Sequence, residues 1–479
     1  MPWYHARMRA AVVVVLLLGA CSKDKPAKDQ PAAKTTDVKQ PEAKPEAKTD
    51  PCAKAVKEGP MAWIADDYPS AVACAKAKKV PVVLDEWAPW CHTCLSMQST
   101  VFTDASFGKD ADKFVFASID TERDGNAPIV AKFPLSAWPT FYVVNPADDA
   151  VLARFVGSAS IDQFHAFLDA GAKAQAGGAA GADARLLGAE RAMATKDLKT
   201  AEEELVAALA AAPPDWSRKP DALVSLIRTR AKRNDIAGCL ATADKYMDDT
   251  GNTASASDFL GYAMGCAEAR EKEEAPRVKA LRERAVARWQ KLLADDKAPL
   301  SVDDRSDAMA SARETLEALG KKDEAKGMAE KQLKLLDDAA AKAPDAKAAA
   351  TYNPHRAEVY AYLGRPLDLV PALEKSAKDL PGNYEPRIRL AWVLMKGGKL
   401  PEATKAADEA LSLVYGPRKA RVLTIRAEIA NKAGDKAGEK TYRAEIVKVL
   451  EALPPDQAQP EALEAAKKQL AALDAPAKK

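Results

Sequence analysis

The hydrophobic pattern of this 479-residue chain changes once, near residues 177–182, and that change restricts the possible folds more than any other feature. Before it, short β-branched runs alternate with segments of helical spacing, as in Val80 to Leu84 followed by Leu95 to Phe102. After it, Ala, Leu, Lys, Glu and Arg recur at helical spacing and no strand pattern is present. We therefore predict a multidomain protein in which an α/β domain precedes an all-α domain.

Composition gives the domain boundaries. A stretch rich in Gly and Ala predicts a linker over residues 176–184. It separates an α/β domain over 51–175 from a helical domain over 185–475, and residues 476–479 form a tail. Residues 22–50 contain almost no large apolar side chain. Such a segment cannot bury enough surface to offset its chain entropy, so we predict a disordered tether there.

Residues 1–21 have the features of an export signal. Basic residues precede a short apolar run, Ala10 to Leu18, which has the proportions of a signal-peptide core rather than of a membrane-spanning helix. The sequence Leu18-Gly19-Ala20-Cys21 resembles the bacterial lipobox, in which the cysteine is lipidated. With Ser22 in the next position, the resemblance implies a periplasmic protein anchored through Cys21 to the outer membrane of a diderm bacterium. The alternative is an ordinary secretory signal with a coincidental cysteine.

Charge and histidine content argue against several classes of function. The 71 basic and 69 acidic residues leave a formal net charge of +2, and no basic stripe with interleaved aromatic residues is present, so the sequence gives no support to nucleic-acid binding. The four histidines, His5, His92, His165 and His355, do not pair at the spacing of metal ligands. We therefore expect no metal site and no cofactor.

Six cysteines remain beside Cys21, and an oxidising compartment favours their pairing. Sequence alone does not choose among their possible connectivities, but their positions fall into three local pairs. We predict structural disulfides for the two outer pairs and redox chemistry for the middle pair: Cys52 with Cys74, Cys239 with Cys266, and Cys91 with Cys94. A second redox pair at Cys52 and Cys74 is the alternative for that pair.

The middle pair forms a Cys-x-x-Cys motif between a buried strand and a helix. A thiol at a helix start lies near unsatisfied backbone N–H groups, which lower its pKa and favour the reactive thiolate. Half of a zinc site would need a second cysteine pair at metal spacing, and c-type haem attachment would need His where Leu95 stands. An ordinary structural disulfide is the remaining alternative.

Residues 60–172 resemble the thioredoxin family, and in particular the C-terminal domain of DsbD-type thiol:disulfide interchange proteins. Asp85 stands six residues before Cys91, where the family has a buried acid. Trp87 and Trp90 match its aromatic positions, and Trp138-Pro139-Thr140-Phe141 matches the loop that contains its cis-proline. Gly157 matches the glycine after its last strand.

The resemblance implies a role for each matching residue. Cys91 is the expected nucleophile, Cys94 the resolving thiol, and Asp85 the group that accepts or relays a proton of Cys94. His92 can supply a positive charge or a donor beside the thiolate. We expect the substrate to bind against an apolar rim formed by Trp90 and Trp138. An extended substrate segment would also pair with the backbone around the cis-proline, at Pro139 and Thr140.

Two departures leave the direction of electron flow open. His92-Thr93 replaces the Gly-Pro of thioredoxins, and a histidine there generally makes the disulfide more oxidising. Asp85 is typical of reductases, and Glu86 replaces the usual apolar residue after the acid. We slightly prefer reduction, because of Asp85 and the resemblance to the DsbD terminal domain.

The helical segment contains turn signals at intervals typical of helix-hairpin repeats. Gly364, Gly398 and Gly434 are separated by about 35 residues, the period of such repeats. Residues 384–417 resemble a tetratricopeptide unit that ends at Pro417. The resemblance implies an α-solenoid that binds a peptide or protein, although a helical array without a binding role is the alternative.

Together these features predict a periplasmic thiol–disulfide oxidoreductase that acts on protein thiols and disulfides and exchanges electrons with an upstream redox partner protein. Its helical repeats would select or hold the partner, and the lipid anchor would attach it to a membrane. Two rival functions remain. One is an envelope scaffold with incidental redox activity, and the other is Cu(I) handling by Cys91 and Cys94.

Overall fold

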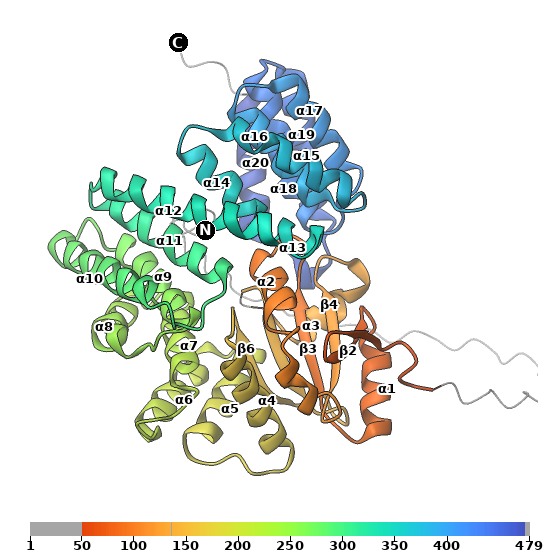
Figure 1. Ribbon diagram of the computed structural model, residues 1–479, viewed down its shortest axis with the longest axis vertical. Coiled ribbons are helices and arrows are strands. Elements are labelled where there is room, and N and C mark those ends of the chain that lie inside the picture. The colour runs from red at the N-terminus through yellow and green to blue at the C-terminus, as the bar shows by residue number, and fades with distance from the viewer. Residues whose placement is uncertain (1–49, 136, 475–479) are drawn as a thin grey trace, which may run out of the picture.

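The computed structural model describes residues 50–135 and 137–474 (Figure 1). They form an N-terminal domain from β1 to α4 and a helical domain from α5 to α20. The predicted signal segment with Cys21, the predicted tether up to residue 49 and the predicted tail lie outside the described residues. Among the helices described, none is long and apolar enough to span a bilayer.

The N-terminal domain is built on one mixed sheet of six strands in the order β1-β2-β4-β3-β5-β6. The central strand β3 pairs in parallel with β4 and antiparallel with β5. The strand predicted within Val80 to Leu84 is confirmed as part of β3, whereas the edge strand β1 and its neighbour β2 were not predicted. The strands are β1 (Val56–Glu58), β2 (Met61–Ala65), β3 (Val82–Trp87), β4 (Val115–Asp120), β5 (Thr140–Val144) and β6 (Val151–Val156).

Helices cover both faces of this sheet, as the alternating sequence pattern predicts. The face that carries Val83 and Phe141 packs against α2 and α4, and the face that carries Leu84 and Tyr142 packs against α1 and α3. Successive residues of a strand point to opposite faces, so this division decides where each side chain of β3 points. The helices are α1 (Tyr68–Lys78), α2 (His92–Thr100), α3 (Ala127–Lys132) and α4 (Ile161–Gln175), with short 3₁₀ helices η2 (Ala105–Lys109) and η3 (Asp124–Asn126).

The helical domain is a succession of helix hairpins, which confirms the predicted all-α array. In Figure 1 it curves from beside β6 over the end of the sheet at which α2 begins. Its helices are α5 (Gly181–Ala194), α6 (Leu198–Ala211), α7 (Lys219–Lys232), α8 (Ile236–Tyr246), α9 (Ala254–Glu268), α10 (Ala275–Ala294), α11 (Val302–Ala318), α12 (Lys322–Lys342), α13 (Ala346–Ala350), α14 (Asn353–Tyr362), α15 (Val370–Asp379), α16 (Tyr384–Lys396), α17 (Leu400–Leu411), α18 (Arg418–Lys432), α19 (Lys436–Glu451) and α20 (Pro460–Asp474), with 3₁₀ helices η4 (Met247–Asp249), η5 (Pro366–Leu369) and η6 (Pro455–Gln457).

The periodic glycines end the first helix of successive hairpins. Gly364, Gly398 and Gly434 have φ values of 76°, 78° and 75°, a left-handed conformation that strains residues with a β-carbon. The residue after each glycine donates its N–H to a carbonyl five residues earlier, in the pairs Arg365 to Tyr360, Lys399 to Leu394 and Asp435 to Ala430. The sequence period is therefore the spacing of helix C-caps.

The predicted linker is wrong at its C-terminal side. Helix α5 begins at Gly181, inside the segment that composition assigns to a flexible linker. This helix docks on the sheet, where the Arg191 Nε donates to the carbonyl oxygen of Val151 at 2.9 Å. A run of small residues suits a close helix–sheet contact as well as a linker, which explains the error.

All three predicted disulfides are confirmed. Cys52–Cys74 joins the segment before β1 to α1, and Cys239–Cys266 joins the successive helices α8 and α9. Cys91–Cys94 lies at the start of α2.

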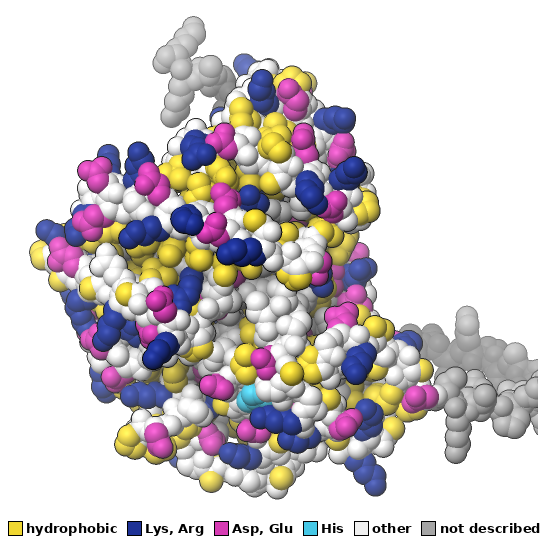
Figure 2. Space-filling view, viewed as in Figure 1, with side chains coloured by type: hydrophobic (Ala, Val, Ile, Leu, Met, Phe, Trp, Pro, Cys, Tyr) yellow, Lys and Arg dark blue, Asp and Glu magenta, His cyan; other side chains and the backbone are white. Residues whose placement is uncertain are grey.

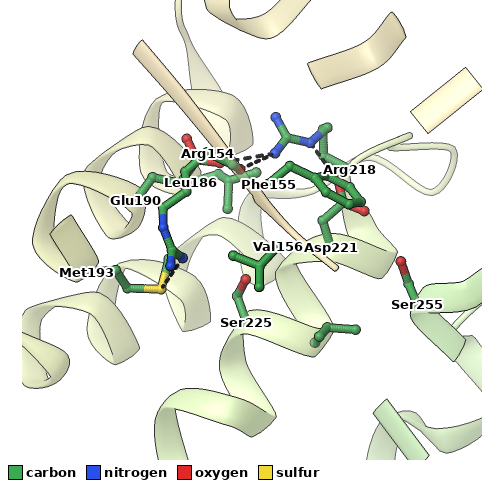
Figure 3. Close-up of a pocket in the computed structure, with 11 residues that line it drawn as sticks. Arg154, Phe155, Val156, Leu186, Glu190, Met193, Arg218, Asp221, Ser225 and Ser255 are labelled. Carbon is green, nitrogen blue, oxygen red and sulfur yellow. Dashed lines mark hydrogen bonds and ion pairs between the residues drawn. The ribbon is translucent and has the colours of Figure 1, made fainter. Parts of the chain in front are cut away.

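A buried ion-pair network holds the two domains together around Arg218 (Figure 3). Its guanidinium lies 3.0 Å from Glu190 Oε1 and 2.7 Å from Asp221 Oδ2, and it donates to the Arg154 carbonyl oxygen at 3.2 Å. The adjoining cavity has a volume of about 10 Å³, no more than one water molecule needs. This region is therefore a structural joint rather than a substrate pocket. Elsewhere, acidic and basic side chains are interspersed over the face shown in Figure 2.

Replacing Arg218 should destabilise the protein strongly. Arg218→Ala leaves the carboxylates of Glu190 and Asp221 buried without their cation, and we expect a loss of about 3–5 kcal/mol in the free energy of unfolding. Chemical denaturation measures it. The matched control is Arg185→Ala, which removes a largely exposed pair with Glu204 and should cost less than about 1 kcal/mol. Equal effects of the two substitutions would contradict this role of Arg218.

Candidate active site

The disulfide lies where β3 leads into α2. Cys91 is the N-cap residue of α2, and its Sγ accepts a hydrogen bond from the N–H of Cys94 at 3.0 Å. After reduction, the same N–H and the positive end of the helix dipole would stabilise a Cys91 thiolate. The two cysteines are only 4% and 2% exposed, which leaves little room for a partner to approach the sulfur atoms.

Asp85 points to the sheet face that α2 covers, because it alternates with Val83 along β3. It is 2% exposed. Its Oδ1 accepts no hydrogen bond from any residue that the structure describes. Burial raises the pKa of this carboxyl to about 8. The raised pKa favours the protonated form of Asp85 and brings its titration close to neutral pH.

Glu86 points to the opposite face and is not part of the redox site. Burial raises its pKa well above the usual range, the charge of Arg154 acts in the other direction, and Asp85 adds to the rise. Arg154 also donates from Nε to the hydroxyl oxygen of Tyr142 at 3.0 Å. Glu86, which replaces the apolar residue usual in the family, is therefore part of the core beside β6.

Two tryptophans lie on either side of the disulfide, where the sequence predicts an apolar rim. The rings of Trp90 and Trp138 meet edge to face with centroids 4.9 Å apart, and both pack against the two cysteines. The indole N–H of Trp90 donates to Glu122 Oε1 at 2.8 Å, and that of Trp138 donates to Thr121 Oγ1 at 2.9 Å. The Trp138–Pro139 peptide bond is cis, which confirms the prediction.

Thr140 does not take the predicted position in the rim. It is fully buried in β5, between β3 and β6, and its hydroxyl donates to the Ala137 carbonyl oxygen at 2.7 Å. The carbonyl oxygen of Pro139 likewise accepts an internal hydrogen bond from Gly157 N–H at 2.9 Å. The Thr140 side chain therefore supports the loop and does not face a substrate.

The helical domain covers the outer side of this rim, a contact that the sequence did not indicate. The Arg418 guanidinium lies 4.7 Å from the centre of the Trp90 ring, and the Arg418 N–H donates to Glu122 Oε2 at 2.7 Å. Tyr415 donates its hydroxyl to Asp120 Oδ2 at 2.5 Å. These partners lie hundreds of residues away along the chain, so no local motif connects them.

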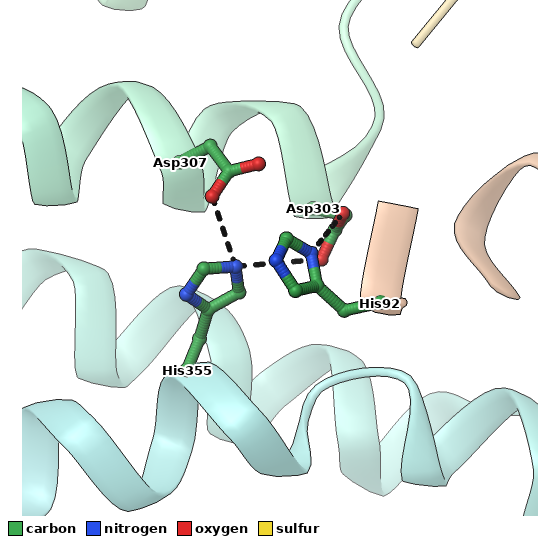
Figure 4. A group of neighbouring side chains, drawn as sticks. All are labelled: His92, Asp303, Asp307 and His355. Carbon is green, nitrogen blue, oxygen red and sulfur yellow. Dashed lines mark hydrogen bonds and ion pairs between the residues drawn. The ribbon is translucent and has the colours of Figure 1, made fainter. Parts of the chain in front are cut away.

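His92 lies against the helical domain, within a group that we call the His/Asp cluster: His92, Asp303, Asp307 and His355 (Figure 4). His92 Nδ1 lies 2.9 Å from Asp303 Oδ2, and the rings of His92 and His355 have centroids 4.2 Å apart. Burial alone would lower the pKa of His92, but the charges of Asp303 and Asp307 and the hydrogen bond outweigh it and raise the pKa to about 9.

His92 and His355 come together in the structure although they do not pair at the spacing of metal ligands in the sequence. Sequence spacing could not show it, because the two residues come from α2 and α14 and meet only through the docking of the domains. The sequence predicts that His92 supplies a positive charge beside the Cys91 thiolate. In the structure this charge is paired with carboxylates, which reduces the net positive charge near Cys91.

Comparison with known proteins supports the assignment of the N-terminal domain. The sequence model of a family described as thioredoxin-like matches residues 62–146. This range includes the cysteine pair, Asp85 and the cis-proline loop. A search of curated proteins finds no match.

Three solved structures, two of them tetratricopeptide repeat proteins, align with the chain at low similarity. A tetratricopeptide repeat protein from Parabacteroides merdae has 12% identity and a TM-score of 0.41, over 61% of this chain and 99% of its own. A thermophilic TPR protein from Thermus thermophilus has 20% identity and a TM-score of 0.24, over 53% and 98%. BtubC from P. vanneervenii has 13% identity and a TM-score of 0.29, over 51% and 94%.

The buried acid makes a testable contribution to stability. Asp85 keeps its proton in the folded chain up to a pKa of about 8, whereas an unfolded chain loses it near pH 4. Raising the pH therefore favours unfolding, by about 1.4 kcal/mol per pH unit between pH 5 and 7. In Asp85→Asn this contribution is absent, so the stability of the variant relative to wild type should rise with pH over that range.

Urea denaturation at a series of pH values measures this difference. Asp162→Asn, an exposed position in the first turn of α4, is the control and should follow the wild-type slope. Parallel curves for Asp85→Asn and wild type would show that the buried carboxyl does not hold its proton.

Proposed function

We propose that this protein is a thiol–disulfide oxidoreductase that acts on protein substrates through Cys91. The observation that carries the proposal is the Cys91–Cys94 disulfide at the N-terminus of α2, flanked by the cis-proline loop, with the buried Asp85 on the sheet face that α2 covers. It lies in a thioredoxin-like domain. Each group is suited to one step of disulfide exchange.

In the reducing direction the chain begins as a dithiol. The Cys91 thiolate attacks a substrate disulfide, which forms a mixed disulfide and releases one substrate thiolate. Asp85 first releases its own proton to solvent, and its carboxylate then accepts the proton of Cys94, which attacks the Cys91 sulfur atom. The products are a second substrate thiol and the Cys91–Cys94 disulfide. A dithiol partner protein upstream must supply the two electrons that restore the dithiol.

Export and lipid anchoring are part of the same proposal. The lipobox-like sequence ending at Cys21 supports attachment to the outer membrane with the domains in the periplasm. The three disulfides suit an oxidising compartment. Incorporation of labelled palmitate into the wild-type chain, and its loss in Cys21→Ser, is the corresponding measurement.

The helical domain has two roles in this proposal. Its hairpins offer a surface for a protein partner. It also covers the aromatic rim, where Arg418 packs on Trp90 and contacts Glu122. A protein substrate reaches Cys91 only when this cover moves away, so partner binding and access to the disulfide are coupled.

Trapping of substrates tests the enzymatic role. In Cys94→Ser the mixed disulfide at Cys91 cannot be resolved, so we expect covalent complexes with envelope proteins on non-reducing gels. Wild type should reduce insulin with dithiothreitol as the electron donor. The double variant Cys91→Ser/Cys94→Ser is the control and should do neither. If Cys94→Ser traps nothing and wild type does not reduce insulin, the scaffold function replaces this proposal.

Weakening the contact between the helical domain and the aromatic rim should accelerate disulfide exchange. Arg418→Ala removes the guanidinium over Trp90, and we expect a rate of insulin reduction a few-fold above wild type, because the open arrangement becomes more populated. Lys419→Ala, at the neighbouring position, where the side chain pairs only with the exposed Glu445, is the matched control and should leave the rate unchanged. An unchanged rate in Arg418→Ala would show that the contact does not restrict access.

A further inference from the structure

We propose that the His/Asp cluster is a binding site for a divalent transition-metal ion such as Zn²⁺, shared between the two domains. This inference goes beyond disulfide exchange, since the site contains no cysteine and does not require the redox reaction.

The four side chains converge from three helices (Figure 4). His92 is the first residue of α2, His355 lies in α14, and Asp303 and Asp307 are four residues apart on α11 and so share one face of that helix. One ligand atom from each residue can be chosen so that all four lie within 4.8 Å of one another. Imidazole nitrogen and carboxylate oxygen are ordinary ligands of Zn²⁺.

The separations suit one shared ion. His355 Nε2 lies 3.1 Å from Asp307 Oδ1 and 3.7 Å from Asp303 Oδ1. A tetrahedral Zn²⁺ with bonds of 2.0–2.1 Å places its ligand atoms about 3.3 Å apart. The two separations from His355 Nε2 are close to this value, and the ligand atoms that are farther apart, by up to 4.8 Å, would have to approach one another when the ion binds.

The hydrogen bonding of the cluster is incomplete. Asp303 Oδ1, Asp307 Oδ1 and His355 Nε2 are buried and make no hydrogen bond with any described residue, although they face one another. Asp303 is 0% and His355 is 3% exposed. Buried polar atoms are normally satisfied by hydrogen bonds. These three atoms make only ion-pair contacts with one another, so a cation at their common point would complete the bonding of all three.

Charge also favours a cation at this point. The two carboxylates carry a charge of −2, and a proton on His92 offsets only one of these charges, so the cluster without an ion keeps a net negative charge that is costly to bury. A divalent ion replaces that proton, binds the neutral imidazoles and cancels both charges. Protonation of both histidines would also balance the charge. It would, however, place two cations in rings whose centroids are 4.2 Å apart, where they repel.

The consequence of binding is a clamp on the closed arrangement. The first ligand comes from the N-terminal domain, at the residue after Cys91, and the other three come from the helical domain. A bound ion would therefore hold the helical domain against the redox motif and slow the exchange reaction.

Zinc titration of the full-length chain tests the site. The disulfides are kept oxidised and Cys21 is replaced in Cys21→Ser, so that no thiol competes for the ion. Isothermal titration calorimetry should then show one tight Zn²⁺ per chain, and Co²⁺ should give the intense visible absorption of a tetrahedral site. In His355→Ala the affinity should fall by about 100-fold or more, since removing a ligand exceeds the effect of an outer-shell partner.

Asp307→Asn, which preserves the shape of the side chain, should weaken binding in the same way and guards against misfolding of the first variant. The matched control is His165→Ala, because His165 also pairs with an aspartate, Asp110, outside the cluster. It should bind Zn²⁺ like the parent. Absence of stoichiometric binding by the parent, or equal binding by His355→Ala and Asp307→Asn, would overturn the proposal. Insulin reduction by wild type without Zn²⁺ tests the redox function separately.

Discussion

Buried charge at the contact between the two domains is the constraint on which the arrangement of the whole chain depends. Arg218 pairs with Glu190 and Asp221 inside the helical domain and reaches across the contact to the Arg154 carbonyl oxygen, and His92 meets Asp303 at the other end. A buried charge without its partner is costly, so the His92–Asp303 pair favours this docking arrangement. The helical repeats are thereby fixed against the sheet rather than suspended from a linker.

This docking turns the redox motif into a feature of both domains. Strand β3 and helix α2 position the disulfide and Asp85, and they belong to the N-terminal domain alone. The groups that surround it are shared, because Arg418 packs on Trp90, and Asp303 and Asp307 neighbour His92. In the proposed mechanism, a partner that displaces the helical domain would therefore change both access to Cys91 and the charge near it.

The part of the site that could be predicted from sequence is the part encoded by local geometry. A strand followed by a Cys-x-x-Cys helix start, a Trp-Pro loop and glycines at helix C-caps each depend on a few adjacent residues. The contacts of Tyr415 with Asp120 and of His355 with His92 depend on the curvature of the whole array, which no short pattern records. Thr140 was misplaced because a motif identifies a loop without showing which side chains face outwards. The linker was misread because small residues serve both flexible and closely packed segments.

The structure also changes the argument about redox direction. From the sequence, His92 favours a stable thiolate and hence an oxidising disulfide, whereas Asp85 favours a reductase. The charge of His92 is offset by Asp303 and Asp307, so its net effect on Cys91 depends on the helical domain remaining in place. Asp85 is uncharged below its pKa of about 8 and does not oppose the thiolate at neutral pH. In the proposed mechanism, displacement of the helical domain would separate His92 from both carboxylates and expose Cys91 to its partner. The movement that admits a substrate would then alter the charge beside the attacking sulfur atom, so the reduction potential would depend on the domain arrangement as well as on the four-residue motif.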